Sequence, residues 1–297
     1  MPHETPREDI GLPAGTSFRL LRWTRSVAHI DIVHGPGRAS QALGRGDHWH
    51  YHPEAELTLI QRGTGTRFVA DQISLFDAGD LVLIGSNVPH YWHLRGTSAG
   101  LSLQWDFPPE HAFWGLPELA PHLKFLADAS RRGLHVRGPS AALIRTRIEQ
   151  LPTLTGMDRL SAFLQLLEAL AQCPTRDLHP IAPRPFSLQG TVQQQAAVRR
   201  AVSYIVAHYR EPVRLQELLR LTGMSRATFA RQFRRHSGKP FSRFLNQVRL
   251  QAVCRALRDS TDPVGAIALS HGFNQLSFFN RLFRREFKCC PTTWRSR

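Results

Sequence analysis

The stretch of sequence that decides the fold runs from Leu215 to Phe244 and reads LQELLRLTGMSRATFARQFRRHSGKPFSRF. A second stretch from Val264 to Trp294, VGAIALSHGFNQLSFFNRLFRREFKCCPTTW, repeats its pattern about fifty residues later. In both stretches, apolar residues recur at helical spacing on either side of a glycine. This internal repeat predicts two copies of one helical unit in the last third of the chain.

Each copy has a glycine where two helices would meet at a sharp turn. Gly223 and Gly272 hold these places, and a positive backbone φ is least costly for glycine. Ser225 and Asn274 follow two residues later, where a side-chain oxygen can cap the second helix. Each copy is therefore predicted to be a helix-turn-helix unit.

Two phenylalanines in each copy are expected to anchor the second helix in the core, and helical geometry then turns polar side chains outward. Arg can bond guanine, and Asn or Gln can bond adenine, through two hydrogen bonds that discriminate by about 1–3 kcal/mol. The anchors are Phe229, Phe233, Phe279 and Phe283. The candidate DNA-binding residues are Ser225, Arg226, Thr228, Arg231, Arg234, Arg235, Asn274, Gln275, Ser277, Asn280, Arg281 and Arg284.

The positive charge of the chain is confined to the same region. The net charge is +15, and residues 191 to 297 contain 20 Lys and Arg against 5 Asp and Glu, whereas residues 1 to 190 contain 18 of each. A local positive field suits a polyanion, because neutralised phosphates release counterions. The alternative is a helical interaction domain with a solvated basic face, which charge alone does not exclude. The repeat, the turns and the caps favour DNA binding.

This region resembles the DNA-binding domain of the AraC/XylS family of bacterial transcription regulators. The shared features are G-M-S-R-x-T-F-x-R-x-F from Gly223, I-A-L-S-x-G-F from Ile267, and Pro291 and Trp294 near the end. The resemblance implies seven helices, two of which enter successive major grooves of double-stranded DNA. It also implies a long helix joining the two units, which should run from about Ser242 to Arg258.

One departure from the family pattern lies before Pro291. Lys288, Cys289 and Cys290 replace the glycine-containing turn that is usual there and that Gly238 preserves in the first copy. The last turn of the second copy is therefore expected to differ in shape.

The region from residue 18 to 107 is different, because short apolar runs alternate there with Gly, Asp and Pro. This spacing predicts a β-sandwich or barrel. The runs are Glu56–Ile60, Thr66–Ala70, Asp80–Ile84 and Gly100–Trp105. Helical periodicity follows at Ser140–Gln150 and Asp158–Gln172, where an apolar stripe from Leu160 to Leu170 is typical of core packing, with a homodimer face as the second possibility.

The segment from Cys173 to Gly190 contains four prolines and little apolar periodicity, so an extended, semi-rigid connector is expected. The predicted fold class is α+β with two domains: a cupin-like double-stranded β-barrel with flanking helices, and an all-α domain with two helix-turn-helix units. The expected divisions are a sensing and dimerisation domain at 1–173, a Pro-rich linker at 174–190 and a DNA-binding domain at 191–297.

The barrel expectation rests on a histidine cluster. Residues 48–52 read HWHYH, and alternation on a strand would put His48, His50 and His52 on one face. The surrounding patterns resemble the two motifs of the cupin superfamily, with Gly85 and Asn87 in place of the usual Pro and Gly. They are Gly44-x5-His50-x-His52-x3-Glu56-x6-Gly63 and Gly79-x5-Gly85-x-Asn87-x2-His90.

In metal-dependent cupins the positions that match His50, His52, Glu56 and His90 hold Fe, Mn, Ni or Zn, and such a donor set suits these ions. The resemblance thus leaves a divalent metal open as a cofactor, and with it a metal-dependent cupin enzyme fused to a DNA-binding module. Analogy with family regulators instead favours a barrel that senses a small molecule without catalysis. A third hypothesis is a constitutive DNA-binding protein whose barrel only dimerises.

An effector in the barrel would be held by convergent polar groups between apolar walls. The candidates are His50, His52, Glu56, Arg67, His90 and Trp92. Aromatic residues beside polar groups suit a sugar or an aromatic acid.

The remaining expectations concern partners and location. No apolar run approaches the ~18 residues that cross a bilayer, and four cysteines without CxxC spacing favour a reducing compartment. We therefore expect a cytoplasmic, nucleoid-associated bacterial regulator that forms a homodimer. Its expected partners are double-stranded DNA and a small-molecule effector, with no membrane.

Overall fold

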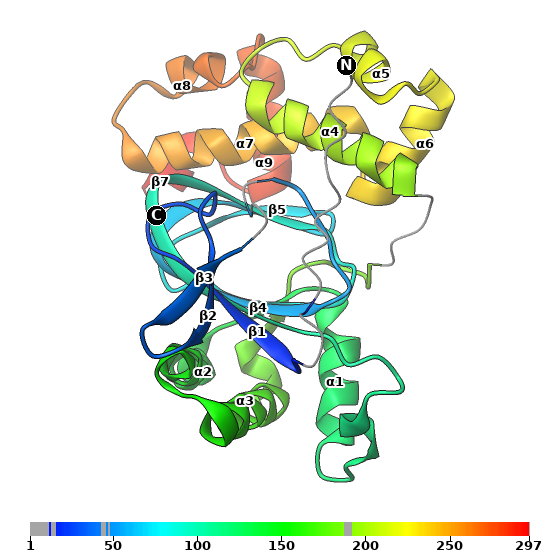
Figure 1. The fold of residues 1–297 in the computed structure, drawn as a ribbon. Coiled ribbons are helices and arrows are strands. Elements are labelled where there is room, and N and C mark those ends of the chain that lie inside the picture. The colour runs from blue at the N-terminus through cyan, green and yellow to red at the C-terminus, as the bar shows by residue number, and fades with distance from the viewer. Residues whose placement is uncertain (1–11, 13–15, 43–45, 47, 187–191, 297) are drawn as a thin grey trace. The chain divides into compact units, whose positions relative to one another are not determined.

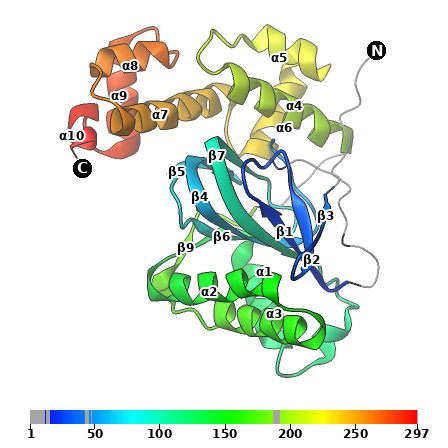
Figure 2. The same ribbon diagram turned by 60° about the vertical axis from the view of Figure 1, so that its left-hand side comes forward.

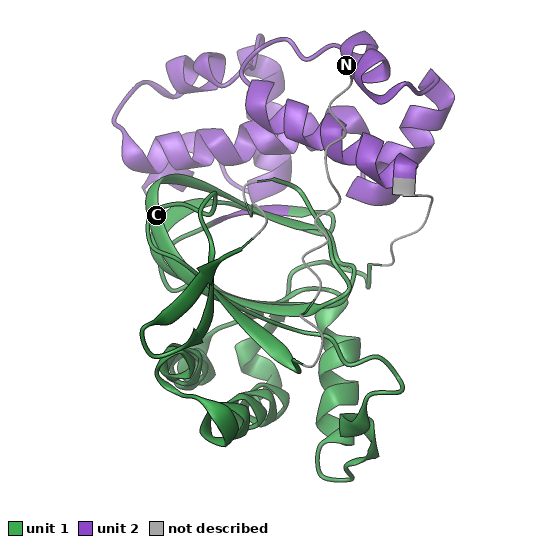
Figure 3. Ribbon diagram, viewed as in Figure 1, with its two compact units in different colours: residues 1–72, 76–188 green, residues 73–75, 189–297 purple. Residues whose placement is uncertain are grey.

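The computed structural model describes residues 12, 16–42, 46, 48–186 and 192–296, which form two compact units (Figure 3). The first unit covers residues 1–72 and 76–188, and the second covers 73–75 and 189–297. The first is rich in strands and the second is helical, so the predicted α+β fold with two domains is confirmed. Residues 187–191, which include the end of the predicted linker and Thr191, lie outside the described part, as does Gly44 of the first barrel motif.

The first unit contains nine strands among its described residues, followed or interrupted by three α-helices (Figures 1 and 2). The strands are β1 Phe18–Trp23, β2 Asp31–Gly35, β3 Arg38–Gln41, β4 Ala55–Val69, β5 Gln72–Phe76, β6 Leu81–Ile84, β7 His90–Trp105, β8 Leu134–Val136 and β9 Leu178–Pro180. The helices are α1 Ala120–Ser130, α2 Gly138–Gln150 and α3 Gly156–Ala171, with short 3-10 turns at Ala112–Gly115, Leu151–Thr153 and Thr175–Asp177.

These strands join in the order β3-β2-β1-β7-β4-β6-β8-β9, with β5 paired to β4, and they curve into a barrel (Figure 1). The two long strands β4 and β7 pair over most of their length, and their register shifts between Ile60 and Thr64. Such irregularities bend a strand and increase its twist. The apolar runs at Glu56–Ile60 and Thr66–Ala70 therefore belong almost entirely to one bent strand, β4, rather than to two.

The larger core cluster of the first unit lies on the outer side of the barrel, under the helices, and a second apolar cluster around Trp23, Ile60 and Trp92 is separate from it. Leu57 and Leu59 of β4 and Leu103 of β7 pack in one buried cluster with Ile144 of α2 and Phe163 of α3. Successive side chains on a strand point to opposite faces. The polar residues that alternate with these leucines therefore face the barrel interior.

The apolar stripe of α3 belongs to this core. Phe163, Leu167 and Leu170 are almost completely buried within their own unit, and Leu160 and Leu164 are half-buried. The expectation of core packing is confirmed. Part of the stripe, at Leu160 and Leu164, is not fully covered, and the homodimer face stays a prediction.

The first half of the predicted connector is part of the barrel unit. Strand β9 pairs with β8, and Asp177 accepts hydrogen bonds from the backbone N–H and the hydroxyl of Ser140, at 3.2 and 2.6 Å, at the start of α2. Polar backbone groups need partners once they pack against a fold. The prolines correctly indicated extended chain, but they did not reveal that this chain completes a sheet.

The second unit contains seven helices among its described residues, as the family resemblance implied. They are α4 Val192–His208, α5 Leu215–Thr222, α6 Arg226–Ser237, α7 Phe241–Asp259, α8 Val264–Ser270, α9 Leu276–Phe287 and α10 Pro291–Arg295. Helix α7 is the long connection between the two helix-turn-helix units, within one residue of its predicted bounds. None of the helices in the described residues has the length and apolar character that a bilayer crossing requires.

The turns of both helix-turn-helix units contain the predicted glycines in positive φ, +67° at Gly223 and +87° at Gly272. Ser225 caps α6, since its hydroxyl accepts the N–H of Thr228 at 3.3 Å. The prediction that Asn274 caps α9 is wrong, because that helix begins one residue later.

The cap of α9 is Gln275, and its side chain makes no capping bond. Phe229 follows its turn glycine by six residues and Phe279 by seven, so the second copy has one extra residue before the helix. The phenylalanine anchor, rather than the glycine, fixes where α9 begins.

The last turn keeps the shape of its counterpart, so the expected difference is also wrong. Lys288 adopts φ +58° and ψ 18° after α9, close to the φ +72° and ψ −6° of Gly238 after α6. A left-handed conformation costs a residue with a side chain about 1–2 kcal/mol. Lys288 is exposed, and its backbone N–H donates to the carbonyl of Arg284 at 3.0 Å. This bond and the packing of the second unit exceed the cost.

We predict that Lys288→Gly stabilises the protein by about 1 kcal/mol, because it removes the cost of the left-handed conformation. Urea denaturation followed by helical circular dichroism measures the change. Gly238→Lys is the reciprocal variant and should destabilise the protein by a similar amount. Equal stability of Lys288→Gly and the parent would contradict the assigned strain.

Candidate effector and DNA-binding sites

The polar side chains of the barrel interior lie at paired positions on three neighbouring strands. Gln104 of β7 is paired with Arg19 of β1 on one side and with Glu56 of β4 on the other. Ser102 of β7 is likewise paired with Thr58 of β4. Residues opposite one another across strands point to the same face. Strand register thus brings together residues that are far apart in the sequence.

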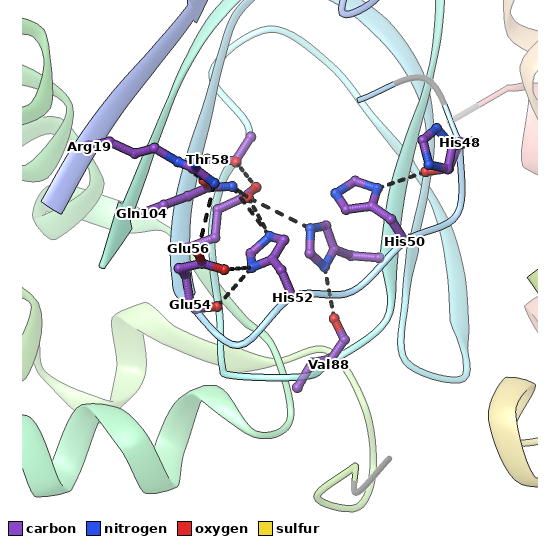
Figure 4. A network of polar contacts seen from close by, with 10 residues as sticks. Arg19, His48, His50, His52, Glu54, Glu56, Thr58, Val88 and Gln104 are labelled. Carbon is purple, nitrogen blue, oxygen red and sulfur yellow. Dashed lines mark hydrogen bonds and ion pairs between the residues drawn. The ribbon is translucent and has the colours of Figure 1, made fainter. Parts of the chain in front are cut away.

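A chain of hydrogen bonds connects these paired residues (Figure 4). Arg19 Nε donates to Gln104 Oε1 at 2.6 Å, and Gln104 Nε2 donates to Glu56 Oε2 at 2.6 Å. The Thr58 hydroxyl donates to the other carboxylate oxygen of Glu56. Glu56 is buried, and a buried carboxylate is stable only when its oxygens receive such bonds.

Three histidines complete the site. His50, His52 and His90 each place Nδ1 against a backbone carbonyl, those of His48, Glu54 and Val88, at 2.8, 3.0 and 2.8 Å. A carbonyl accepts only a proton, so each Nδ1 is the protonated nitrogen and Nε2 is turned toward the interior. His48 itself is half-buried, and segment 48–52 is an isolated bridge to β7 rather than a strand.

Burial and neighbouring carboxylates set the protonation of this cluster. Burial opposes the charge of His52, but hydrogen bonds and charges from Glu54 and Glu56 raise its pKa to about 9. Burial likewise opposes the charge of Glu56, yet His90 and His52 hold the pKa of that carboxyl well below its usual value. Burial lowers the pKa of His50, so its imidazole is neutral. His52 and Glu56 therefore form an ion pair at neutral pH.

The histidines also satisfy the tests for a divalent metal site that the barrel family implies. Donor atoms of His50, His52 and His90 lie within 4.8 Å of one another, and His90 Nε2 is buried without a hydrogen bond. Glu56 lies beside two of them, with Oε2 3.7 Å from His90 Nε2. These residues would hold a borderline ion once His52 gives up its Nε2 proton. A bound ion would supply a Lewis acid for an effector oxygen.

A cavity of about 60 Å³ opens beside this cluster inside the barrel. His50, His52, Glu56 and Trp92 line it, as predicted for an effector site, and the other lining residues are Arg19, Leu21, Trp23, Val27, Ile30, Gly46, Thr58, Ser102 and Gln104. Arg67 does not line it, because its guanidinium pairs with Asp80 at 2.5 Å. His90 lies next to the cavity through its ring contacts with His50 and Trp92.

Five polar or aromatic lining residues were missed by the sequence analysis: Arg19, Trp23, Thr58, Ser102 and Gln104. The alternation E-L-T at 56–58 and S-L-Q at 102–104 contained a signal for three of them, because the intervening leucines face the outer core. No local sequence pattern marks Arg19 or Trp23. A side chain at position 100 would meet the Trp23 ring at 2.4 Å, so Gly100 makes room for that ring.

In the second unit, the twelve candidate DNA-binding side chains all reach the surface. Thr228 and Asn280 are half-buried and the other ten are exposed. On the first helix-turn-helix unit, Arg226, Arg231, Arg234 and Arg235 line one open depression of about 1,000 Å³ beside α6. Guanidinium groups gathered around one helix suit a phosphate backbone and base edges.

A contact that the sequence did not indicate fixes the second turn against α4. Arg249 of α7 donates from Nε to the carbonyl of Tyr209 at 2.7 Å, and from its terminal nitrogen to that of Glu211 at 2.8 Å. A side chain at Gly272 would meet the Arg249 Nε and the Tyr209 carbonyl, each at 2.7 Å. Gly272 is therefore required for close approach as well as for its positive φ.

Comparisons with known proteins agree with this geometry. A helix-turn-helix domain model matches residues 218–297, and a cupin domain model matches residues 38–103. The transcriptional activator RhaS of Escherichia fergusonii is 27% identical over 249 residues, covering 82% of this chain and 85% of the relative. The RhaS protein of Salmonella arizonae is 26% identical over 254 residues with the same coverage.

Among solved structures, a probable AraC family transcriptional regulator from Rhodopseudomonas palustris is 34% identical, covering 34% of this chain and 94% of that one, with a TM-score of 0.32. The chain belongs to the AraC family of transcription regulators. ToxT from Vibrio cholerae covers 94% of this AraC-family chain at 11% identity and a TM-score of 0.35.

Membership of the AraC family decides between the broad function classes. The protein is a DNA-binding transcription regulator, and its relatives are transcriptional activators rather than enzymes. The hypothesis of a cupin enzyme with a DNA-binding tail is therefore set aside.

We predict that Arg249→Ala lowers the free energy of unfolding of this AraC-family protein by about 1–3 kcal/mol, because two carbonyls lose a charged donor. Arg243→Ala is the matched control on the same helix, since Arg243 is exposed. It should change stability by less than about 0.5 kcal/mol. Urea denaturation compares the two variants, and similar losses in both would show that the Arg249 contacts are not specific.

Proposed function

We propose that this regulator is controlled by a small, polyhydroxylated effector that binds in the barrel cavity. The observation that carries the proposal is a pair of unsatisfied polar groups in the cavity wall. Trp23 Nε1 and Ser102 Oγ are buried, line the cavity and have no hydrogen-bond partner among the described residues. Buried polar groups without partners are costly, so a ligand that bonds to them gains affinity.

The charges of the cavity favour a neutral effector. Arg19 and His52 are cations, Glu54 and Glu56 are anions, and the four lie in one connected network. An aromatic acid would bring a carboxylate to a site with no excess positive charge. A sugar-like molecule brings hydroxyl groups that both donate and accept, and its ring can stack on indole faces.

The size of the cavity limits the effector further. A water molecule needs about 10–15 Å³ of such space, so 60 Å³ accommodates the equivalent of about four to six waters. A compact polyol or small sugar fits this space better than a bulky aromatic compound. The neighbouring imidazoles of His50 and His90 extend the polar side of the site.

We further propose that α6 and α9 are the recognition helices. The first presents Arg226, Arg231 and Arg234, which suit guanine and phosphate, whereas the second presents Gln275, Ser277 and Asn280 beside Arg281 and Arg284. The first unit should therefore favour guanine contacts, and the second should favour adenine contacts. An effector would regulate transcription by binding more tightly to one of two states of the protein.

We predict that Arg231→Ala and Asn280→Ala each weaken binding to a specific operator by about 1–3 kcal/mol, because each removes one base contact. Binding to random DNA should change much less. Gel-shift titrations with an operator selected from random oligonucleotides measure both affinities, and Arg220→Ala provides an exposed arginine outside the candidate set. Equal losses on specific and random DNA would refute base recognition by these two residues.

For the barrel, we predict that a sugar-like effector raises the melting temperature of the full-length protein. Saturation at 100 times the dissociation constant adds about 2.7 kcal/mol of stability. Trp23→Phe and Ser102→Ala should each reduce this gain, because they remove one hydrogen-bonding group and leave the cavity shape nearly intact. A panel of sugars and polyols screened by thermal shift provides the measurement.

Ser98→Ala is the matched control, since Ser98 is a buried, unpaired serine of the same strand that does not line the cavity. Its response to the effector should equal that of the parent. An effector response that survives both cavity variants would place the effector site elsewhere.

A further inference from the structure

A second pocket lies on the outer side of the barrel, where α1 packs near the end of β7. Its volume is about 240 Å³. It shares no lining residue with the barrel cavity. The lining residues are Pro53, Ala55, Ser86, Trp105, Asp106, Phe107, Trp114, Leu123, Leu126, Ala127, Ser130 and Arg131.

The apolar wall of this pocket is held in place by the fold. Trp105, Leu123 and Leu126 are buried parts of the outer core. Trp114 is fixed by a hydrogen bond from its Nε1 to the carbonyl of Phe107 at 3.0 Å. Walls that are fixed in this way do not collapse into the space between them, so the pocket is preformed.

Two charged side chains of opposite sign line the same pocket. Asp106 is half-buried and Arg131 is exposed, and neither side chain makes a hydrogen bond or ion pair with the described residues. Burial raises the pKa of Asp106, the nearby carboxylates of Glu54 and Glu110 raise it further, and His111 offsets only a part of this rise. A cation beside Asp106 would relieve both effects.

We propose that this pocket binds a small zwitterion with an apolar body, of the class of α-amino acids with apolar or aromatic side chains. The ammonium group pairs with Asp106 and lies against aromatic faces, where cations are attracted to the ring. The carboxylate pairs with the guanidinium of Arg131, whose planar fork matches it. The side chain of the ligand packs on Trp105 and Phe107.

Charge and size exclude the simpler ligand classes. A plain carboxylic acid would pair with Arg131 but meet the negative charge of Asp106 and of the nearby Glu54 and Glu110. A plain amine would pair with Asp106 but leave Arg131 without an anion. Each therefore gains one ion pair, where a zwitterion gains two. The volume of 240 Å³ is below the roughly 300–1,000 Å³ of pockets for drug-sized ligands, which suits a molecule of amino-acid size.

This site is separate from the effector site proposed above, because the two pockets share no lining residue. A ligand there would act on α1 and on the ends of β4 and β7, which contribute Ala55 and Trp105 to the pocket. Leu123 and Leu126 of α1 form one side of the pocket, so a ligand there would hold this helix more firmly to the barrel.

The test is isothermal calorimetry on the full-length protein with three related probes: L-phenylalanine, phenethylamine and 3-phenylpropionate. L-Phenylalanine should bind about tenfold or more tightly than either single-charge probe, because it gains both ion pairs. Asp106→Asn should weaken L-phenylalanine and phenethylamine but not 3-phenylpropionate. Arg131→Gln should weaken L-phenylalanine and 3-phenylpropionate but not phenethylamine.

Ala127→Trp fills the pocket from the exposed surface of α1 and should abolish binding of all three probes. Asp128→Asn is the matched control, since Asp128 is the exposed neighbour on α1 and does not line the pocket. Far-UV circular dichroism confirms that each variant is folded, and the conservative Asp106→Asn change keeps the shape of the side chain.

Two results would show that the pocket is not a binding site, and a third would contradict the class of its ligand. One is the absence of binding by L-phenylalanine to the parent protein, and the other is binding that persists unchanged in Ala127→Trp. Equal affinity for phenethylamine and L-phenylalanine would contradict the zwitterion class. The barrel proposal stands apart from these outcomes, because Trp23→Phe should leave L-phenylalanine binding intact while it weakens the response to a sugar.

Discussion

The charge of Glu56 inside the barrel is the constraint on which the rest of the first unit depends. Its carboxylate is 5% exposed, so it must receive hydrogen bonds from donors within the protein. Gln104, Thr58 and His52 supply them, and strand register puts these donors within reach. Once their polar groups face inward, the alternating leucines must face outward, and the helices are needed to cover them. The larger part of the hydrophobic core therefore lies outside the barrel, whereas a smaller apolar cluster that includes Trp23 and Trp92 borders the cavity inside it.

The sequence predicted the parts of this fold that are encoded locally. The resemblance to the AraC/XylS family placed helix α7 within one residue of its bounds. The start of α9 was predicted one residue too early, because the position of its cap was inferred from the distance to Gly272 and not from the distance to the buried Phe279. Strand β9 was missed because three residues among the four prolines of the connector have no period, and only pairing with β8 makes them a strand.

The residues of the candidate site likewise separate into those that a local motif marks and those that only the folded sheet brings together. The motif spacing marked His50, His52 and Glu56, which lie close together in the chain, and the structure brings them to one cavity. Arg19 and Gln104 are 85 residues apart and meet only because β1 and β7 are neighbours. Such register is a property of the whole sheet, so no short pattern contains it. Arg67 was an effector candidate because it is a basic residue near aromatic residues, but this local pattern does not show that it pairs with Asp80.

Helices α6 and α9, the proposed recognition helices, have a chemical property that follows from their composition. Every cationic side chain on α6 and α9 other than histidine is an arginine. Among the three lysines of the chain, Lys239 is buried, and Lys124 and Lys288 lie outside both helices. Acetylation removes the charge of lysine but does not act on a guanidinium. The positive charge of α6 and α9 is therefore insensitive to lysine acetylation.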